Sequence, residues 1–314
     1  MGFVVGLDAG GTSTRAVVLD LDGTRLGAGV AGGANPNSHP PARAASQVGD
    51  ALRAALDGLD VRKVESGVLG MAGSSKLTDP AVAALFEQAW TGAGLRCPMR
   101  VVTDSEAAFA AGSASPDGTV VVAGTGSIAA RIVDHRMERT SGGYGWLLGD
   151  EGSAFWMGRE AVRDTLAQLE EVGARLSALA EAVLGMSLVE TAERRRMWSR
   201  LITVVNSAPP IGLARYAPLV SAMAADGDPH ALKIVEAAAV HLTNTAMAAR
   251  NPGETTPIVL VGSLVGPCSP VGDRLTAMLR ARSGATVKVA AEGAAGAAWL
   301  AAVDLLGPTA PRPA

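Results

Sequence analysis

Cysteine is nearly absent from this sequence. The chain has only two cysteines, Cys97 and Cys268, and they lie far apart. Because no CxxC pair exists, a zinc ribbon and a disulfide framework are both excluded. We therefore expect a cytoplasmic protein whose two thiols are ordinary small side chains in a reducing compartment.

Charge is scarce as well. The 27 basic and 30 acidic residues nearly cancel to a net charge of −3, and charged residues make up only 18% of the chain. No polycationic surface is available to a nucleic-acid backbone. Nucleic acid is therefore not an expected partner.

Long apolar runs are also missing. No uninterrupted apolar stretch reaches the ~18–20 residues that span a bilayer, and residues 1–7 lack the length and basic start of a signal peptide. The four histidines form no HxH or HExxH pair, so zinc is not indicated. We expect a soluble protein without membrane contact.

The residues that are present suffice for two domains. With 314 residues, 48% of them hydrophobic, the chain can build two cores. Strand patterns at 3–7, 14–21 and 25–30 predict a β-meander, and a glycine- and proline-rich loop follows at 32–41. Helical patterns then alternate with strand patterns at 64–70 and 100–103, which indicates an α/β domain with parallel strands.

The meander returns in weaker form after a polar segment at 113–119. Strand patterns at 120–123, 128–133 and 136–140 precede a mostly helical region, and α/β alternation resumes at 257. This echo predicts two domains on one plan: an N-terminal α/β domain over 1–113, and a C-terminal α/β domain with a helical insertion over 114–314. The last helix is a candidate to pack back on the N-terminal domain.

The first candidate site is the segment GLDAGGTST, where a buried strand ends at Asp8. The glycines at 10 and 11 let the backbone approach an anion closely, and their N–H groups suit phosphate oxygens. A carboxylate at the strand end can hold Mg²⁺ against the same phosphates. The alternative is an ordinary hairpin with glycine in its turn.

A second strand-and-glycine segment, VVVAGTGS, stands at 120–127. Each glycine loop leads into a strand, and GxGxxG and GxxxxGK[ST] are both absent, so a Rossmann site and a P-loop are excluded. Two such loops, one per domain, can bind a polyphosphate from two sides.

A third candidate is Asp104, at the end of the strand pattern VVTD. A carboxylate there is well placed to take a hydroxyl proton while that hydroxyl attacks a γ-phosphate. The alternative is that Asp104 only caps the following helix.

The fourth candidate is the segment 142–163, GGYGWLLGDEGSAFWMGREAVR. Aromatic side chains such as Tyr144 and Trp146, next to the carboxylates of Asp150 and Glu151, are the groups that bind a sugar. The alternative is a helix N-terminus whose acidic residues complement the dipole.

These motifs together resemble a known family. DAGGTST, TDSEAA, GTGS, GGYGWLLGDEGSAFW and VGS, in this order, resemble the N-acetylglucosamine kinases of the family that these share with the benzoyl-CoA reductase activator ATPases. The resemblance covers nearly the whole chain; GDEGSAFW is its specific part, whereas DAGGT marks only the actin-like ATPase superfamily. It implies an α/β, two-domain actin-like ATPase (ribonuclease H-like) fold with an interdomain cleft, and a homodimer.

The resemblance implies a role for each matching residue. Asp8 is the Mg²⁺ carboxylate and Asp104 the catalytic base. ATP is bound by Gly10, Gly11 and Thr12, by Gly124, Thr125, Gly126 and Ser127, and by an adenosine loop at Gly262 and Ser263. The sugar is contacted by Asn35, Gly73, Tyr144, Gly145 and Asp150. Two departures stand out: Tyr144 replaces the family's usual Trp, and Asn37 competes with Asn35 as the sugar-binding residue.

The implied function is ATP-dependent phosphorylation of N-acetylglucosamine at its 6-hydroxyl. A glucosamine kinase is the first alternative, since the two sugars differ at one substituent. An activator ATPase of a 2-hydroxyacyl-CoA dehydratase or benzoyl-CoA reductase is a further alternative, but it needs cysteines soon after the second glycine loop, and residues 127–250 contain none. A chaperone or filament would lack the GGYGWLLGDEGS segment.

Overall fold

The computed structural model describes all residues except 1, 172, 174, 190, 192, 291 and 314. It divides into two compact units: unit 1 comprises Met1–Val120, Ile132–Glu138 and Ala290–Ala314, and unit 2 comprises Val121–Arg131 and Arg139–Val289. We describe each unit by itself. The predicted boundary between residues 113 and 114 stays a prediction.

The first sheet has the strand order β3-β2-β1-β4-β5. Its strands are β1 (Phe3–Ala9), β2 (Ser13–Asp20), β3 (Arg25–Gly32), β4 (Val64–Met71) and β5 (Met99–Thr103). β1, β2 and β3 pair antiparallel, whereas β1, β4 and β5 run parallel. The predicted meander followed by parallel strands is therefore confirmed.

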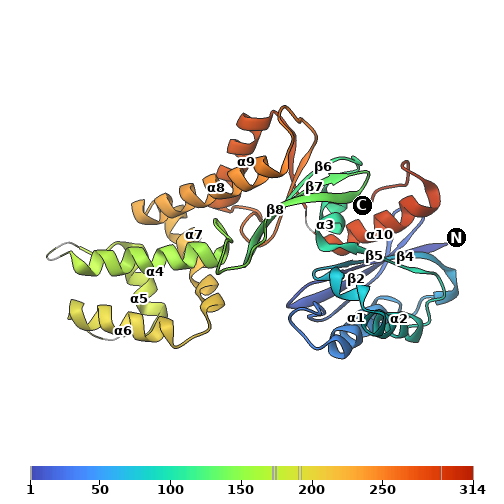
Figure 1. Ribbon diagram of the computed structural model, residues 1–314, viewed down its shortest axis with the longest axis horizontal. Helices are drawn as coiled ribbons and strands as arrows, with labels where there is room; N and C mark the ends of the chain where they lie inside the picture. The colour runs from blue at the N-terminus through green and yellow to red at the C-terminus, as the bar shows by residue number, and fades with distance from the viewer. Residues whose placement is uncertain are drawn as a thin grey trace. The chain divides into compact units, whose positions relative to one another are not determined.

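Helices cover both faces of this sheet, as Figure 1 shows. The helices are α1 (Pro41–Ala55), α2 (Pro80–Gly92), α3 (Asp104–Gly112) and α10 (Gly293–Leu306), with short 3-10 helices at Val61–Lys63 and Ser74–Thr78. Side chains alternate along β1, so Val5 packs toward α1 and α2 while Val4 packs toward α3 and α10. The last helix thus belongs to unit 1.

The second sheet repeats the order of the first. Its order is β10-β9-β6-β7-β8, which read from β8 matches β3-β2-β1-β4-β5 strand for strand. Its strands are β6 (Gly118–Ala123), β7 (Ser127–Val133), β8 (Arg136–Gly142), β9 (Ile258–Val261) and β10 (Val287–Val289). The predicted repeat of one plan is confirmed at the level of strand order.

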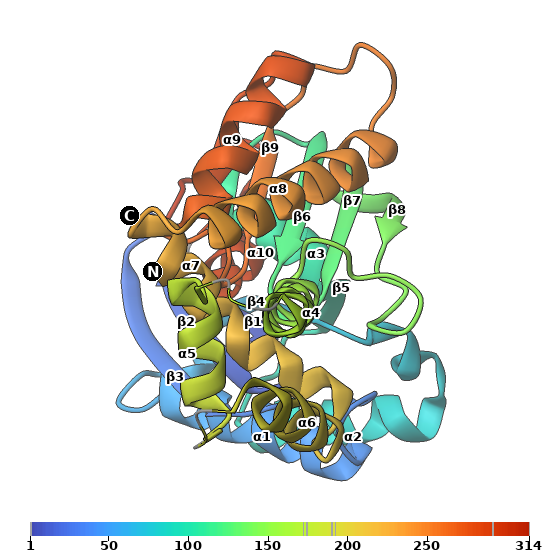
Figure 2. The same ribbon diagram turned by 90° about the vertical axis from the view of Figure 1, so that its left-hand side faces the viewer.

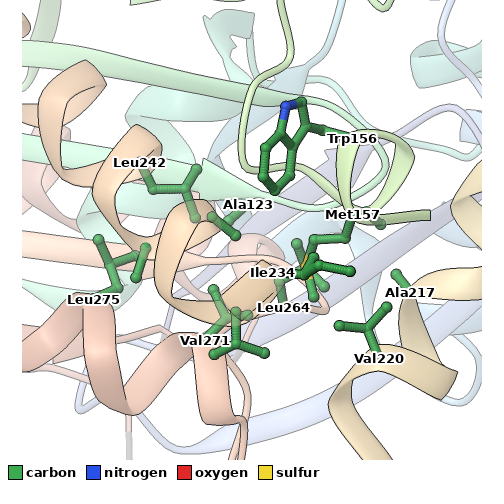
Figure 3. Packing of buried hydrophobic residues seen from close by; sticks show 14 of the residues in the cluster. Ala123, Trp156, Met157, Ala217, Val220, Ile234, Leu242, Leu264, Val271 and Leu275 are labelled. Atoms are coloured by element: carbon green, nitrogen blue, oxygen red, sulfur yellow. The ribbon is translucent and has the colours of Figure 1, made fainter. Parts of the chain in front are cut away.

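The helical region of unit 2 supplies most of its core. Its helices are α4 (Ala154–Glu170), α5 (Ala178–Met186), α6 (Arg194–Asn206), a 3-10 helix at Pro210–Tyr216, α7 (Ala217–Ala225), α8 (Pro229–Ala249) and α9 (Pro270–Ser283). Figure 2 shows α8 and α9 lying side by side. In Figure 3, Met157 of α4, Ile234 of α8 and Val271 of α9 converge in one buried cluster. Among the described residues, none of the helices is long and apolar enough to cross a membrane.

The contact between α10 and its neighbours depends on small residues. A Cβ added at Gly6 would overlap backbone atoms of Ala294 and Ala298, and one added at Gly296 would overlap the carbonyl oxygen of Ala107 on α3. Any side chain at these positions would push α10 away from β1 or α3. Glycine inside a helix lowers the stability of the helix, and the close packing that Gly296 permits offsets this cost.

We predict that Gly296→Ala lowers the free energy of unfolding by about 1–3 kcal/mol, because the overlap outweighs the better helix propensity of alanine. Gly92→Ala is the matched control: it lies in α2, and a Cβ there meets no atom within 4 Å. Urea unfolding should show Gly92→Ala unchanged or stabilised by up to about 1 kcal/mol. Equal effects of the two substitutions would contradict this packing account.

Candidate functional site

Three parallel strands of unit 1 end at the same edge of the sheet. Ala9 of β1 lies opposite Met71 of β4, and Met71 lies opposite Thr103 of β5. The residues that follow these strands therefore emerge together, since carboxyl ends of in-register parallel strands coincide. Asp8, the segment at Gly73, and Asp104 share this edge.

Asp8 lies where the negative charge of its ionised carboxylate is unfavourable. Burial, and to a smaller extent the nearby negative charge of Asp104, raise the pKa of the Asp8 carboxyl from 3.8 to about 6, while Arg15 opposes the shift. Arg15 lies directly opposite Asp8 in the β1–β2 ladder. A Cβ at Gly293, the first residue of α10, would lie 2.6 Å from Asp8 Oδ2, so glycine gives the carboxylate its room.

Asp104 does not cap α3. Thr103 Oγ1 accepts from Glu106 N at 3.2 Å, and Glu106 Oε2 accepts from Thr103 N at 2.6 Å, which forms a capping box. Among the described residues, the carboxylate of Asp104 accepts only from the neighbouring Ser105, with Ser105 N at 2.9 Å. Burial raises the pKa of Asp104. The capping alternative is therefore wrong. The T-x-x-E spacing of the capping box was a readable signal that the sequence analysis missed.

The predicted sugar-binding residues of unit 1 lie beside the first glycine loop. Ala34 N and Asn35 N both donate to Gly10 O, at 3.0 and 3.1 Å. Gly73 has a φ of 79°, and a Cβ there would lie 2.6 Å from Asn35 Oδ1 and 2.5 Å from Asn37 Nδ2. Unit 1 thus gathers seven of the predicted site residues: Asp8, Gly10, Gly11, Thr12, Asn35, Gly73 and Asp104. Both asparagines approach Gly73, so the choice between them stays open.

The second glycine loop is fixed within unit 2 by the start of α4. Ala154 N donates to Gly124 O at 2.9 Å, and Phe155 N donates to Thr125 O at 3.2 Å. Ser127 N donates to Asp150 Oδ1 at 3.0 Å, and Ser127 Oγ donates to Glu151 O at 3.1 Å. The loop is therefore held by backbone groups at and just before the start of α4 and by the carboxylate of Asp150.

Asp150 is buried, and its carboxylate contacts this loop. Its φ is 62°, a strained value for a residue other than glycine, and a Cβ at Gly126 would lie 2.9 Å from its carboxylate oxygens. The dipole alternative does not describe it, because Ser153 caps α4 by accepting from Trp156 N. Tyr144, by contrast, is 67% exposed, and Gly145 beside it meets no atom within 4 Å of an added Cβ.

A cavity adjoins the second glycine loop inside unit 2. Its volume is about 490 Å³, and its walls come mainly from α7 and from the loop after β9. Thr125 and Ser263 line it, with Pro218, Ser221 and Cys268. Gly262 has a φ of 113°, and a Cβ there would overlap Ala123 O, so the adenosine loop lies against the glycine loop. The small residues of α7 escaped the sequence analysis because they look like ordinary core.

The residues at the edge of unit 1 fit a magnesium ion. Mg²⁺ keeps several waters and is bound by one or two carboxylates together with substrate phosphates. Asp8 supplies one such carboxylate, and its raised pKa marks a charge for which the fold provides little compensation. No cluster of three or more metal-ligating side chains occurs among the described residues. This fits Mg²⁺ brought in with a nucleotide.

Comparisons with known proteins agree with this geometry. The sequence pattern of the BadF/BadG/BcrA/BcrD ATPase family matches residues 5–301. An N-acetylmuramic acid/N-acetylglucosamine kinase of Clostridium acetobutylicum is 30% identical over 176 residues, 55% of this chain and 56% of the relative. An N-acetyl-D-glucosamine kinase of Dictyostelium discoideum is 26% identical over 185 residues, 55% of this chain and 57% of the relative. The matched segments thus span just over half the length of these curated relatives.

A solved structure resembles the whole chain. It is that of a proposed N-acetylglucosamine kinase from Chromobacterium violaceum, with 26% identity and a TM-score of 0.72 over 96% of this chain and 99% of the other. The expected α/β fold of the actin-like ATPases is therefore confirmed.

We predict that Asp8→Asn stabilises the ligand-free protein at neutral pH. The folded state keeps the Asp8 proton up to about pH 6, whereas an unfolded chain loses it near 3.8, so stability falls as pH rises through this window. At pH 7.5 the substitution should raise the free energy of unfolding by about 2–3 kcal/mol, and below pH 4 the gain should vanish. Urea unfolding at both pH values measures it. Asp57→Asn, at an exposed position, is the control; a gain that does not change with pH would contradict the assignment.

Proposed function

The chain belongs to the BadF/BadG/BcrA/BcrD ATPase family, and from that premise we propose that it is an ATP-dependent kinase that phosphorylates N-acetylglucosamine at the 6-hydroxyl. The observation that carries the proposal is the edge of the unit 1 sheet, where the predicted sugar-binding residues lie beside a glycine loop and two carboxylates. The relatives named as N-acetylglucosamine kinases support this choice of sugar.

Asp104 is the proposed general base. Its carboxylate accepts from Ser105 N but is not the N-cap of α3, and burial raises its pKa, so it is a stronger proton acceptor than an exposed aspartate. It orients the 6-hydroxyl and accepts its proton as the oxygen attacks the γ-phosphorus. The bond between the γ-phosphorus and the oxygen that bridges it to the β-phosphate breaks, and ADP is the leaving group.

The two glycine loops are the proposed phosphate-binding groups. Among the described residues, no acceptor is bonded to the N–H groups of Gly11 and Thr12, so these two donors are available to phosphate oxygens. In the second loop, Thr125 N and Gly126 N likewise have no acceptor among the described residues, whereas Gly124 N donates to Gly126 O and Ser127 N to Asp150 Oδ1. The segment from Gly124 to Ser127 is therefore proposed to bind phosphate through these two amides, with the base of ATP in the cavity lined by Ser263. Mg²⁺ held at Asp8 would neutralise phosphate charge.

Three residues of unit 2 complete the proposed sugar contacts. Tyr144 and Gly145 lie in an exposed segment of unit 2 and are proposed to contact the sugar from there. The carboxylate of Asp150 already holds Ser127 N, so its proposed contribution to sugar binding is shared with support of the phosphate loop. Homodimer formation stays a prediction.

We predict that Asp104→Asn lowers kcat by about 100-fold or more with little change in KM, because proton acceptance is lost while binding surfaces remain. A coupled ADP-release assay measures both constants. Asp57→Asn, exposed and in the same unit, should retain wild-type rates. Near-normal turnover of Asp104→Asn would show that this aspartate is not the base.

An acceptor panel tests the substrate. ADP release should require an amino sugar, be fastest with N-acetylglucosamine, slower with glucosamine, and cease with 6-deoxy-N-acetylglucosamine, which lacks the attacking oxygen. Phosphorus NMR of the product should show a phosphate ester on C6. Turnover with the 6-deoxy sugar, or ATP hydrolysis that no sugar accelerates, would contradict the proposal.

A further inference from the structure

We propose that His39 is a positioning residue that fixes the first glycine loop in its phosphate-binding conformation and thereby couples sugar binding to nucleotide binding. The coupling rests on the proposed function; the fixing of the loop rests on geometry within unit 1.

Two loops of unit 1 approach each other unusually closely here. Segment 33–39, which we name the clasp loop, follows β3, and the glycine loop at 10–12 follows β1. A Cβ at Gly33 would overlap Gly11 O and would lie 2.7 Å from His39 Nε2. Glycine at 33 is therefore required for the two backbones and the imidazole to meet.

Donors from the clasp loop occupy both carbonyls of the glycine pair. Gly10 O accepts from Ala34 N and Asn35 N, and Gly11 O lies 2.7 Å from Nε2 of the half-buried His39. Because a carbonyl oxygen can only accept, Nε2 carries the proton in this contact. His39 is the only side chain among the described residues that bonds to a carbonyl of this glycine pair.

These bonds set the direction of the phosphate-binding amides. In a trans peptide the C=O and the N–H point in opposite directions, and no described peptide bond is cis. Gly10 O faces the clasp loop, so Gly11 N–H points away from it; Gly11 O faces His39, so Thr12 N–H points away from His39. Gly11 and Thr12 are exposed, and these are the two amides for which no acceptor is found among the described residues.

The clasp loop also carries the proposed sugar ligand. Asn35 donates its own N–H to Gly10 O, and its side chain accepts from Asn37 N at 2.8 Å, next to Gly73. A sugar that orders Asn35 therefore orders the loop that contains His39. Because His39 Nε2 donates to Gly11 O, an ordered His39 also restricts the peptide between Gly11 and Thr12. Sugar and nucleotide should therefore each strengthen the binding of the other.

The experiment measures the Kd of the Mg²⁺ complex of β,γ-imido-ATP by calorimetry, without and with saturating N-acetylglucosamine. In the wild type the sugar should lower this Kd by about fivefold or more. His39→Ala should raise the sugar-free Kd by about three- to tenfold, and the sugar should then change it little. His39→Gln, which keeps a side-chain N–H donor, should recover most of both effects.

Two further variants separate positioning from folding. Ser38 lies in the same loop, and among the described residues its side chain forms no hydrogen bond to the glycine loop, so Ser38→Ala should keep the wild-type Kd and the wild-type sugar effect. His39→Met has a side chain of similar size without the donor and should behave as His39→Ala. Melting temperatures are measured for all variants. Should His39→Ala prove to be unfolded, the comparison of the Kd of His39→Gln with that of His39→Met tests the proposal in its place.

An unchanged sugar-free Kd in His39→Ala and His39→Met, or a loss of equal size in His39→Gln, would overturn the assignment of His39. If no amino sugar is phosphorylated by the wild type, the proposed function fails, and the sugar-free Kd still decides whether His39 fixes the glycine loop. If His39→Ala and His39→Met raise the sugar-free Kd as expected but the sugar leaves the wild-type Kd unchanged, the coupling is overturned and the role of His39 in fixing the glycine loop stands.

Discussion

The in-register parallel pairing of β1, β4 and β5 is the constraint on which the candidate site depends. Because Ala9, Met71 and Thr103 lie side by side, three separate segments of chain leave the sheet at one edge, and each brings one functional element. A shift of one residue in any strand would turn its side chains to the other face and remove Asp8 or Asp104 from this edge. The close packing of α10 against β1 and β4 supports this pairing from one face of the sheet.

Both units hold backbone carbonyls in place beside the amides that we propose to bind phosphate. In unit 1 the carbonyls of Gly10 and Gly11 face the clasp loop, and in unit 2 those of Gly124 and Thr125 face the start of α4. Since peptide groups are rigid, tying down the oxygen on one side presents the nitrogen on the other. No lysine or arginine is needed for this, which agrees with the low charge of the chain. Preorganised dipoles of this kind stabilise charge without reorganising during the reaction.

The sequence predicted the strands, the order of helices and the repeat of one plan, because alternating apolar residues and glycine turns are local signals. The parts that it could not predict depend on contacts between distant segments. The partners of Asp150 and His39 lie 23 and 28 positions away along the chain, and nothing in their own neighbourhood announces them. The cavity wall at α7 consists of small residues that sequence patterns assign to a core. Asp104 was separated from its capping role only by the observed bonds of Thr103 and Glu106.

Amide hydrogen exchange at single-residue resolution tests the central claim most directly. If the glycine loops bind phosphates as described, the Mg²⁺ complex of β,γ-imido-ATP should slow exchange at Gly11 and Thr12, because these amides gain an acceptor that the free protein does not give them. The amides of Thr125 and Gly126, which also lack an acceptor among the described residues, should slow in the same titration. Saturable nucleotide binding that leaves the exchange of Gly11 and Thr12 unchanged would contradict the account.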